Sequence, residues 1–365
     1  MDISKITRPV LLLDEEKCLA NIENMVKRAK SNNVLFRPHF KTHQSPLIAM
    51  MFREYGVDKI AVSSVTMAAQ FAMHGWSDIT IAFPANPRET DEINRLARTS
   101  KINLLTTDYE HLVSFADKLE HETALFIKID TGYKRSGIDW NSYPDIERIV
   151  NFANERELLR TTGLLTHSGH TYRARGRDEV LAIYNDTRHK MLNTKGIIPG
   201  NDLIVSLGDT PSAALTDEFE GVDEIRPGNF IFFDYMQSLI GSCSEEDIAV
   251  ALAVPVVSVN RRRNEAVIYG GSVHLSKDGV TVDGETRYGK AVSLDGDRWH
   301  CSGHLGYVTS LSQEHGVVKL TEEAAGTVRP GSLIAILPVH SCLTADAMRS
   351  YLTMKGRVIT TAIEK

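Results

Sequence analysis

The sequence has few cysteines and no long apolar run. Its four cysteines (Cys18, Cys243, Cys301 and Cys342) lie far apart in 365 residues, and no two of them form a Cys-x-x-Cys pair. This spacing excludes a disulfide framework and favours a reducing compartment. No stretch approaches the roughly 20 apolar residues of a membrane span, and the N-terminus lacks the apolar core of a signal peptide. We therefore expect a soluble cytoplasmic protein without a membrane partner.

The sequence also lacks an excess of positive charge. The formal net charge is -6 and the pI is near 6.1, which argues against a nucleic-acid partner. Charged residues at 24% and hydrophobic residues at 42% are typical of a globular chain. We find no internal repeat and no Gly-x-Gly-x-x-Gly turn after a predicted strand, so the main sign of a dinucleotide-binding sheet is missing.

Strand-like and helix-like segments alternate between about residues 34 and 235. The predicted strands are 34–37, 60–63, 79–83, 102–105, 124–129, 162–167, 203–206 and 221–225. Amphipathic segments such as 45–55, 65–74, 87–97 and 144–155 lie between them and predict helices. Eight strand–helix units in roughly 200 residues predict a (β/α)8 barrel, with a doubly wound sheet as the alternative.

The pattern changes after about residue 245. Segments 249–259, 265–269, 287–290, 305–311, 317–320 and 333–337 predict strands joined by Gly-rich or charged turns. Val10–Asp14 predicts a further buried strand ahead of the barrel. We therefore expect an α/β protein with three parts: a strand within residues 1–20 that joins the C-terminal sheet, a barrel in 21–244, and a β domain in 245–365.

A group of basic side chains follows the first barrel strand. Arg37, His39, Lys41 and His43 are spaced two residues apart, so on an extended chain they would share one face. Like charges on one strand face repel, so stability gives no reason for this arrangement. A lysine among cations has a lowered pKa and becomes a usable nucleophile. A solvated basic strand end is the structural alternative.

Other polar residues follow the later strands, where barrel enzymes collect their catalytic groups. Asp130 and Arg135 follow the fifth predicted strand, and His167, His170 and Tyr172 follow the sixth. Ordinary loop polarity is the alternative for the two histidines and the tyrosine.

The loops after the seventh and eighth strands are where this fold commonly seats a phosphate. Their glycines leave room for backbone N–H groups, and their polar side chains can donate: Gly208, Gly228, Thr210, Ser212 and Asn229. A phosphate cradle together with Lys41 suggests pyridoxal phosphate held as a Schiff base. Barrel enzymes that use a Schiff-base lysine without a cofactor fit these residues too.

The last predicted strand runs into His340 and Cys342. The two residues are two apart, so both could face one side, and both are good zinc ligands. Two ligands suit an open site that water and substrate complete. A buried cysteine and an unrelated histidine form the alternative.

Seven short motifs occur in one order over nearly the whole chain. They are Thr7-x-Pro9 before a Leu-rich strand ending in Asp14, Arg37-Pro-His-x-Lys-Thr-His43, Asp130-Thr-Gly-x-x-Arg-x-Gly137, His167-x-Gly-His-x-Tyr172, Gly208-x-Thr-Pro211, Arg226-Pro-Gly228 and Pro338-x-His-Ser-Cys342. This set resembles the D-serine dehydratase and D-threonine aldolase group, which are fold-type III pyridoxal phosphate enzymes with an alanine-racemase-like barrel.

The resemblance implies roles for single residues. Lys41 would carry pyridoxal 5'-phosphate and be the catalytic residue. Six further residues would contact the cofactor or the substrate: Arg135, His170, Tyr172, Thr210, Gly228 and Asn229. The resemblance also implies a homodimer that acts on a small D-amino acid. One residue departs from the usual pattern, because Asp209 stands where a small hydroxyl residue is more common. An anion beside a phosphate is unfavourable unless its side chain points away.

The final motif separates the two branches of the group. By the resemblance His340 and Cys342 would hold a divalent metal, and His-x-Cys looks like the zinc-dependent dehydratases. The aldolases more often show His-x-Asp and use Mn2+ or Mg2+. We therefore expect a dehydratase that converts a β-hydroxy D-amino acid to a 2-oxo acid and ammonia. A D-threonine aldolase, a racemase and a non-enzymatic cofactor-binding protein remain alternatives, and serine, threonine and 3-hydroxyaspartate all fit as substrates.

Overall fold

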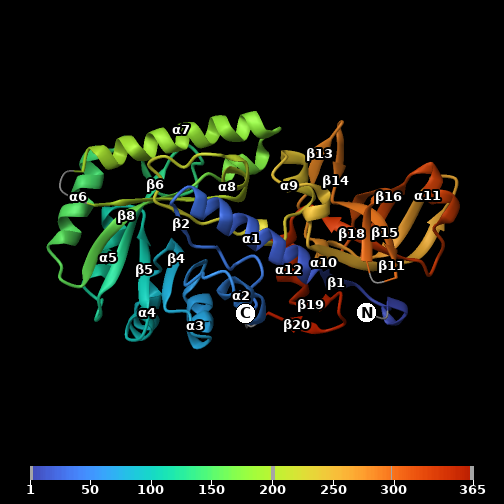
Figure 1. Ribbon diagram of the computed structural model, residues 1–365, viewed down its shortest axis with the longest axis horizontal. Helices are drawn as coiled ribbons and strands as arrows, with labels where there is room; N and C mark the ends of the chain where they lie inside the picture. The colour runs from blue at the N-terminus through green and yellow to red at the C-terminus, as the bar shows by residue number, and fades with distance from the viewer. Residues whose placement is uncertain (1–2, 199–201, 297, 362–365) are drawn as a thin grey trace. The chain divides into compact units, whose positions relative to one another are not determined.

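The computed structural model describes residues 3–198, 202–296 and 298–361. Two compact units divide the chain: one contains residues up to Ile22 together with Asn229–Thr361, and the other contains Glu23–Gly228. The sequence placed these boundaries at 20/21 and 244/245. Figure 1 shows the second unit as the mixed strand-and-helix part and the first as the part dominated by strands.

The Glu23–Gly228 unit is a nearly closed parallel barrel. Its strand order is β2-β10-β9-β8-β6-β5-β4-β3, and a bridge between His39 and Ala61 links the two ends. The strands are β2 (Leu35–Phe36), β3 (Lys59–Val62), β4 (Asp78–Pro84), β5 (Lys101–Thr106), β6 (Thr123–Asp130), β8 (Leu159–His167), β9 (Ile204–Gly208) and β10 (Glu224–Ile225). All eight predicted strands are present, which confirms the barrel fold. A short extra strand, β7 (Ile138–Asp139), pairs with β6.

Helices alternate with these strands (Figure 1). They are α1 (Glu15–Ser31), which crosses the unit boundary, α2 (Pro46–Arg53), α3 (Val65–Met73), α4 (Thr90–Ala97), α5 (Tyr109–Ala116), α6 (Tyr143–Asn154), α7 (Arg177–Gly196) and α8 (Thr210–Leu215), with 3-10 turns η2 (Pro87–Glu89) and η3 (Gly169–Arg173). Side-chain caps start several of them; for example, Ser64 accepts from Met67 N and Asp108 accepts from His111 N. Proline occupies the first turn of α2, η2 and α6.

A buried polar network ties distant barrel strands together. Arg37 Nε lies 2.6 Å from Glu224 Oε2, and Arg37 Nη1 lies 2.6 Å from Asp78 Oδ1. Ser206 Oγ donates to the other oxygen of Glu224 (2.6 Å) and accepts from Arg226 Nε (2.6 Å). Arg37 and Glu224 are 3% and 0% exposed, so each charge depends on its partner.

Replacing Glu224 with glutamine is expected to lower the free energy of unfolding by about 3 kcal/mol, because Arg37 then keeps one carboxylate instead of two. Urea unfolding of the cofactor-free protein measures the change. The matched control, Glu157→Gln, alters an exposed carboxylate and should shift the free energy by less than about 0.5 kcal/mol. Equal effects of the two substitutions would contradict a stabilising role for this network.

The other unit is built on one large sheet. Its strand order is β12-β17-β16-β15-β18-β11-β1-β19-β20, and a further β11–β12 pairing closes the first six strands into a ring. The strands are β1 (Val10–Leu13), β11 (Val250–Asn260), β12 (Glu265–Tyr269), β15 (Gly289–Asp295), β16 (Arg298–Leu311), β17 (His315–Leu320), β18 (Leu333–Pro338), β19 (Ser350–Thr353) and β20 (Val358–Thr360). β1 pairs with β11, so the N-terminal strand lies in the C-terminal sheet.

Short elements surround this sheet. The hairpin β13 (Val280–Val282) and β14 (Glu285–Arg287) stands apart from it. The predicted strand 287–290 therefore covers the end of β14 and the start of β15. The helices are η1 (Ile3–Lys5), η4 (Asn229–Ile231), α9 (Tyr235–Ile240), η5 (Glu245–Asp247), α10 (Ser272–Leu275), α11 (Glu322–Thr327) and α12 (Ser341–Met348).

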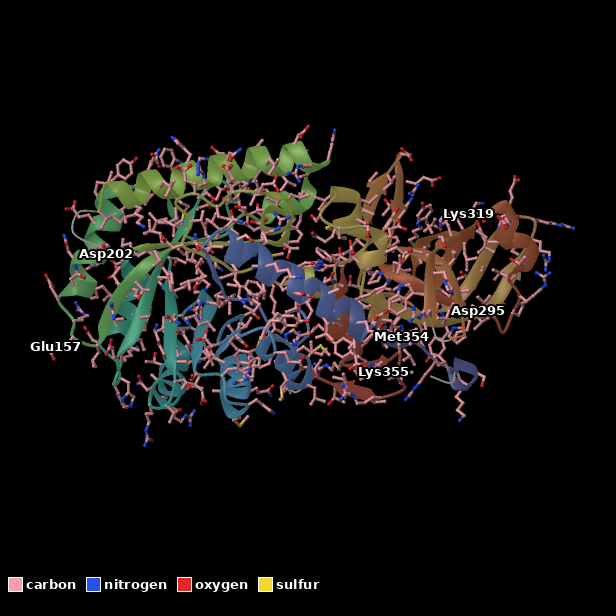
Figure 2. All side chains as sticks on the ribbon, viewed as in Figure 1. Glu157, Asp202, Asp295, Lys319, Met354 and Lys355 are labelled. Carbon is pink, nitrogen blue, oxygen red and sulfur yellow. The ribbon has the colours of Figure 1, made fainter. Side chains whose placement is uncertain are left out.

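Charged side chains cover the surface. Figure 2 labels five of them, and all five are exposed: Glu157, Asp202, Asp295, Lys319 and Lys355. Within the described ranges, no helix combines the length and the apolar character that crossing a bilayer requires.

Candidate active site

Lys41 lies on a tight turn that follows β2. The Lys41 backbone N–H donates to His39 Nδ1 (3.3 Å), and Gln44 Nε2 donates to the Lys41 carbonyl (3.2 Å). Gln44 has a φ of +51°, a left-handed conformation that is uncommon for a residue with a side chain. Such strain persists only where the surrounding structure fixes the backbone. The turn therefore presents Lys41, whose side chain is exposed, from a constrained backbone.

The expectation that four basic side chains share one face here is wrong. The chain turns after His39, and the alternation of faces ends with the extended backbone. Arg37 points to its two buried carboxylates. His43 packs against Phe40, with ring centroids 4.6 Å apart, and burial lowers its pKa to about 3. His43 is thus a neutral core residue, and neither end of the motif adds charge beside Lys41.

Cations do surround Lys41, but most of them come from other strands. Burial and the charges of Lys41 and Arg226 hold the pKa of His39 well below its usual range. Burial together with Lys41 and Arg135 does the same to the pKa of His167. Both histidines are therefore neutral near pH 7, and Arg226 and Arg135 carry positive charge in this environment. Such a site attracts an anionic ligand.

A second lysine lies in the same environment. Burial, followed by the charges of Arg226 and Arg135, lowers the pKa of Lys128 to about 7. Its Nζ donates to the Ile129 carbonyl (3.2 Å). Lys128 is not among the predicted site residues. The sequence did contain a signal for it, because a lysine within an otherwise apolar strand is unusual. It is the natural comparison for Lys41.

The loop after β6 brings Arg135 and Tyr133 to the site. Asp130 Oδ1 accepts from Gly132 N (2.8 Å) and Lys134 N (3.1 Å), which folds the loop back on the strand end. The Arg135 guanidinium lies 5.1 Å from the centre of the Tyr133 ring. Tyr133 is not among the predicted residues, because nothing in the sequence separates it from other loop tyrosines.

The loop after β8 holds the predicted His170 and Tyr172. His170 stacks on Tyr133 at 6.1 Å and 23°, and its pKa is lowered by burial and by Lys190. Tyr172 lies across the next loop, because its hydroxyl accepts from Thr210 N (3.2 Å). His167 Nδ1 bonds to the Gly208 carbonyl, so two neighbouring loops are joined at the strand ends.

Thr210 is the clearest donor in the predicted phosphate loop. The residue is 0% exposed, and its Oγ1 has no hydrogen-bond partner within the described part of the chain. A buried hydroxyl without a partner costs free energy unless a ligand supplies one. Nearby, a Cβ at Gly208 would lie 2.8 Å from Arg226 Nη1, so glycine keeps this loop close to a cation. These features fit a phosphate group.

The Asp209 carboxyl is bound at the start of α8. Its Oδ1 accepts from Ser212 N (2.7 Å) and from Thr171 Oγ1 (3.1 Å), so the carboxyl caps α8. Burial outweighs these hydrogen bonds and raises the pKa of Asp209 to about 6. The departure from the usual pattern therefore has a structural role as a helix cap.

Removing the Thr210 hydroxyl is expected to weaken binding of pyridoxal 5'-phosphate by about ten- to a hundredfold. The lost hydrogen bond to a charged group is worth roughly 1.5–3 kcal/mol. Equilibrium titration of the cofactor-free protein measures the affinity of Thr210→Ala. Thr162→Ala, which changes a threonine within β8 five residues before its end at His167, should bind the cofactor as the native chain does. An unchanged affinity in Thr210→Ala would show that this loop is not the phosphate site.

Gly228 follows the last barrel strand, β10, by three residues and lies beside the Lys41 turn. A Cβ at this position would lie 3.0 Å from the His39 carbonyl oxygen and 3.0 Å from Thr42 Oγ1. That approach is tighter than a side chain normally allows, so glycine suits this position. The predicted contact between Gly228 and the cofactor stays a prediction.

In the other unit, His340 and Cys342 lie at the start of α12, which follows β18. Burial opposes protonation of His340, but hydrogen bonds with Asp278 and Cys342 raise its pKa to about 10. His340 Nδ1 lies 2.7 Å from Asp278 Oδ2. Asp278 could not be predicted from the sequence, because it lies 62 residues before His340 and is recognisable there only as part of a turn.

These residues fit a divalent metal. A carboxylate on Nδ1 fixes the imidazole so that Nε2 is left to act as a ligand, an arrangement common at metal sites. The neighbouring thiol of Cys342 supplies a soft second donor. In the part of the chain that the structure describes, no group of three or more His, Cys, Asp or Glu side chains could hold a metal. A metal held by His340 and Cys342 alone would keep open positions.

Asn229 uses its side chain differently from the prediction. Its Nδ2 donates to Asp234 Oδ2 (2.6 Å) and Ser341 Oγ (3.0 Å), so both amide hydrogens have acceptors within this unit. The remaining Oδ1 is an acceptor and cannot donate to a phosphate. A contact between Asn229 and the cofactor phosphate would therefore have to come from the backbone N–H of Asn229. This contact stays a prediction.

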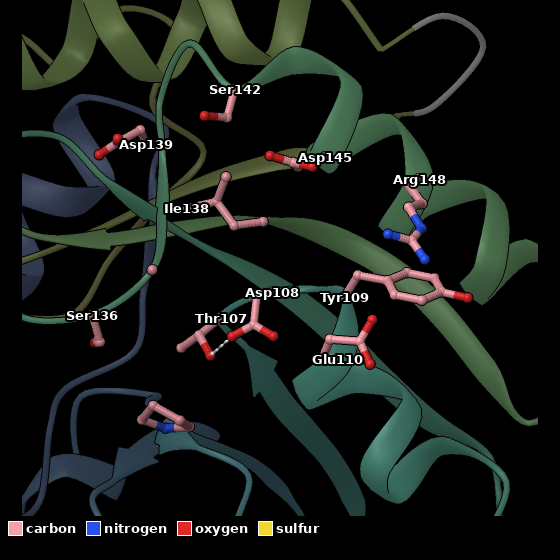
Figure 3. A pocket seen from close by; sticks show the side chains of 12 residues that line it. Thr107, Asp108, Tyr109, Glu110, Ser136, Ile138, Asp139, Ser142, Asp145 and Arg148 are labelled. Atoms are coloured by element: carbon pink, nitrogen blue, oxygen red, sulfur yellow. Dashed lines mark hydrogen bonds between the residues drawn. The ribbon is translucent and has the colours of Figure 1, made fainter.

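A cavity of about 630 Å³ lies in the barrel unit beside the loop after β6 (Figure 3). It is lined by several carboxylates, among them Asp108, Asp139 and Asp145, and by Arg148, whose guanidinium lies 3.4 Å from the centre of the Tyr109 ring. None of the predicted site residues lines it, so the candidate chemistry lies elsewhere.

The barrel unit, with Lys41 and Thr210 after its strands, is compatible with an alanine-racemase-like protein, and the family comparison establishes this class. The model of the "Alanine racemase, N-terminal domain" matches residues 13–236, so the chain belongs to this family. A second model, the "Putative serine dehydratase domain", matches residues 249–354. Together they confirm the family resemblance that the seven motifs predicted.

The similar proteins with a named activity include dehydratases that match over most of the chain. D-serine dehydratase from Dictyostelium discoideum is 29% identical over 96% of this chain and 94% of its own length. D-threo-3-hydroxyaspartate dehydratase from Delftia sp. (strain HT23) is 28% identical over 94% and 93%. A solved structure of a D-threo-3-hydroxyaspartate dehydratase, a cysteine-to-alanine mutant in the metal-free form, superposes with a TM-score of 0.90 at 25% identity over 100% of this chain and 99% of its own.

The aldolases are more distant. D-threonine aldolase from Arthrobacter sp. is 25% identical over 64% of this chain and 62% of its own length. The relatives with a named activity are thus dehydratases and aldolases, which are lyases. The predicted enzyme class is confirmed.

Proposed function

We propose that this protein is a pyridoxal 5'-phosphate- and metal-dependent dehydratase of β-hydroxy D-amino acids. The products are a 2-oxo acid and ammonia. The observation that carries the proposal is the donor set at the start of α12: an imidazole held by Asp278 and a thiol beside it. Four dehydratases that match over more than 90% of the chain support the same reaction.

Three residue groups would hold the cofactor. Lys41 would form the covalent linkage, Thr210 would donate its buried hydroxyl to the phosphate, and Arg226 and Arg135 would balance the negative charge. When bound, pyridoxal phosphate supplies an electron sink for charge at Cα, and a divalent metal supplies a Lewis acid for a β-oxygen.

The chain's own residues would do the remaining work. Lys41, as a neutral amine, would take the Cα proton of the substrate. Arg135 would bind a substrate carboxylate, because a guanidinium offers two parallel donors to it. His170 and Tyr133 would form a stacked wall that orients the substrate. Asp278 would hold the His340 ring so that Nε2 faces the metal.

Zinc is the proposed metal, since thiolate ligation favours zinc over manganese or magnesium. The proposal also includes a homodimer in the cytoplasm. All four cysteines are free thiols, which supports a reducing compartment. Light scattering at several protein concentrations tests the dimer.

Product analysis tests the reaction itself. The holoenzyme is incubated separately with D-serine, D-threonine and D-threo-3-hydroxyaspartate, with the L-enantiomers as controls. We expect a 2-oxo acid and ammonia from at least one D-amino acid and none from the L-forms. Glycine and an aldehyde would indicate an aldolase instead, which the aldolase relatives make the second candidate. The enantiomer alone would indicate a racemase, and no product at all would leave a cofactor-binding protein.

A further inference from the structure

The side-chain amide of Asn229 is directed at the thiol that the proposed function assigns to the metal. Asn229 Nδ2 lies 3.6 Å from Cys342 Sγ, in hydrogen-bond range for sulfur. The same nitrogen lies 2.6 Å from Asp234 Oδ2 and 3.0 Å from Ser341 Oγ. A primary amide has two hydrogens. One is directed to the carboxylate, and the other is shared between the Ser341 hydroxyl and the sulfur.

Asp234 anchors this amide. Its Oδ1 accepts from Gln237 N (3.0 Å), and its Oδ2 accepts from Ser341 N (3.0 Å) as well as from Asn229. Asp234 is 2% exposed. The residue before it, Phe233, is buried and has a φ of +47°, a strained conformation for a bulky side chain. The backbone is thus held in a strained form at the point that places the Asn229–Asp234 pair.

We propose that Asn229, held by Asp234, is a positioning residue for the metal ligand Cys342. This inference rests on the proposed function. An N–H group donated to a thiolate fixes the direction of the sulfur and draws charge away from it, which lowers its donor strength toward a metal. Asp278 positions the other proposed ligand, His340, through a hydrogen bond to its Nδ1. Each of the two ligands therefore has its own polar partner within the same unit.

Cobalt substitution tests this role with a readout other than activity. The full-length holoenzyme is stripped of metal with a chelator and titrated with Co2+, and the thiolate-to-cobalt charge-transfer band is recorded with the dissociation constant. In Asn229→Ala the sulfur is more electron-rich, so the band should move to longer wavelength. The loss of orientation should weaken cobalt binding by about tenfold or more. Ser341→Ala frees the shared hydrogen for the sulfur, so its band should move to shorter wavelength.

Asn21→Ala is the matched control. Asn21 is also buried in this unit, at 5% exposure, but its Nδ2 donates to the backbone carbonyls of Ile231 (3.2 Å) and Asp247 (2.9 Å). This variant should lower the melting temperature and leave the cobalt band and affinity at the wild-type values. Equal changes in Asn229→Ala and Asn21→Ala would reduce Asn229 to a structural role and overturn the inference.

The remaining outcomes separate the inference from the function on which it rests. If Asn229→Ala shows the wild-type band position and the wild-type cobalt affinity, the inference is overturned and the proposed metal site is unaffected. A wild-type protein without any thiolate band would overturn the metal site and the inference together. Should Asn229→Ala fail to fold, an unshifted band in Ser341→Ala overturns the inference by itself.

Discussion

The turnover rate of Lys41→Ala is expected to be lower by about 10⁴-fold or more, and the covalent link to the cofactor should be absent. The same side chain would hold pyridoxal phosphate and take the Cα proton, and a positioned base alone contributes up to about 10⁴-fold. Borohydride reduction followed by peptide mapping locates the link. In the native chain, the modified peptide should contain Lys41.

Lys128→Ala is the matched comparison for this test. Lys128 lies among the same arginines, and its pKa of about 7 makes it a competent nucleophile by charge state alone. Lys128, however, is buried in β6, whereas Lys41 is exposed on a turn. We therefore expect Lys128→Ala to keep the borohydride-trapped link at Lys41. A link that survives in Lys41→Ala would move the role to Lys128 or Lys134.

The barrel could be predicted because its signal is local and repeated. Each predicted strand is an apolar segment of the kind that a buried parallel strand requires, and the spacing between segments matches one helix. All eight were found within a few residues of their predicted bounds. The N-terminal strand could be placed in the C-terminal sheet for the same reason, because an apolar segment ahead of a complete barrel needs another partner.

The environment of Lys41 could be predicted in kind but not in detail. A cationic site was expected from residues spaced two apart, and that reasoning needs an extended chain. The backbone turns after His39, so the charges beside Lys41 come from Arg226 and Arg135. Both are more than 90 residues away in sequence. No spacing rule reaches across such a distance, and only the closed barrel brings these residues together.

The partners of the metal residues were invisible for a similar reason. His340 and Cys342 are adjacent enough to stand out, but Asp278 and Asn229 lie on separate turns of the same unit. An Asp in a turn and an Asn after a Pro-Gly pair are common for purely local reasons. The roles of Asp278 and Asn229 depend on which side chains lie opposite them. Those neighbours are set by the tertiary fold of the unit and not by the local turn sequence.

Removing the metal is expected to lower turnover by about a thousandfold or more while the link at Lys41 remains. A Lewis acid contributes several kcal/mol to the departure of a β-hydroxyl, and each 1.36 kcal/mol is tenfold in rate. The proposed metal residues lie at the start of α12, and the proposed cofactor residues Lys41, Thr210 and Arg226 follow strands of the barrel. A chelator should therefore leave the absorbance of the bound cofactor largely intact.

Restoring different metals then identifies the one that the site prefers. Zinc should restore activity better than manganese or magnesium, because a thiolate is a soft ligand. Cys342→Asp replaces it with a hard oxygen donor, so this variant should exchange zinc for manganese or magnesium and eliminate water more slowly. Cys301→Ala is the control, since its thiol bonds to the Glu245 carbonyl (3.2 Å) and should not alter metal preference.

Two outcomes would change the interpretation in different ways. Full turnover by the metal-free protein would remove the Lewis acid from the reaction, and racemisation would then describe the chemistry better, because it needs only proton transfer at Cα. Glycine and an aldehyde from the zinc-loaded protein would mean that Cys342 does not select elimination over Cα–Cβ cleavage. In that case the choice between the two bonds would rest with the groups that take the proton, from Cα in one reaction and from the β-hydroxyl in the other.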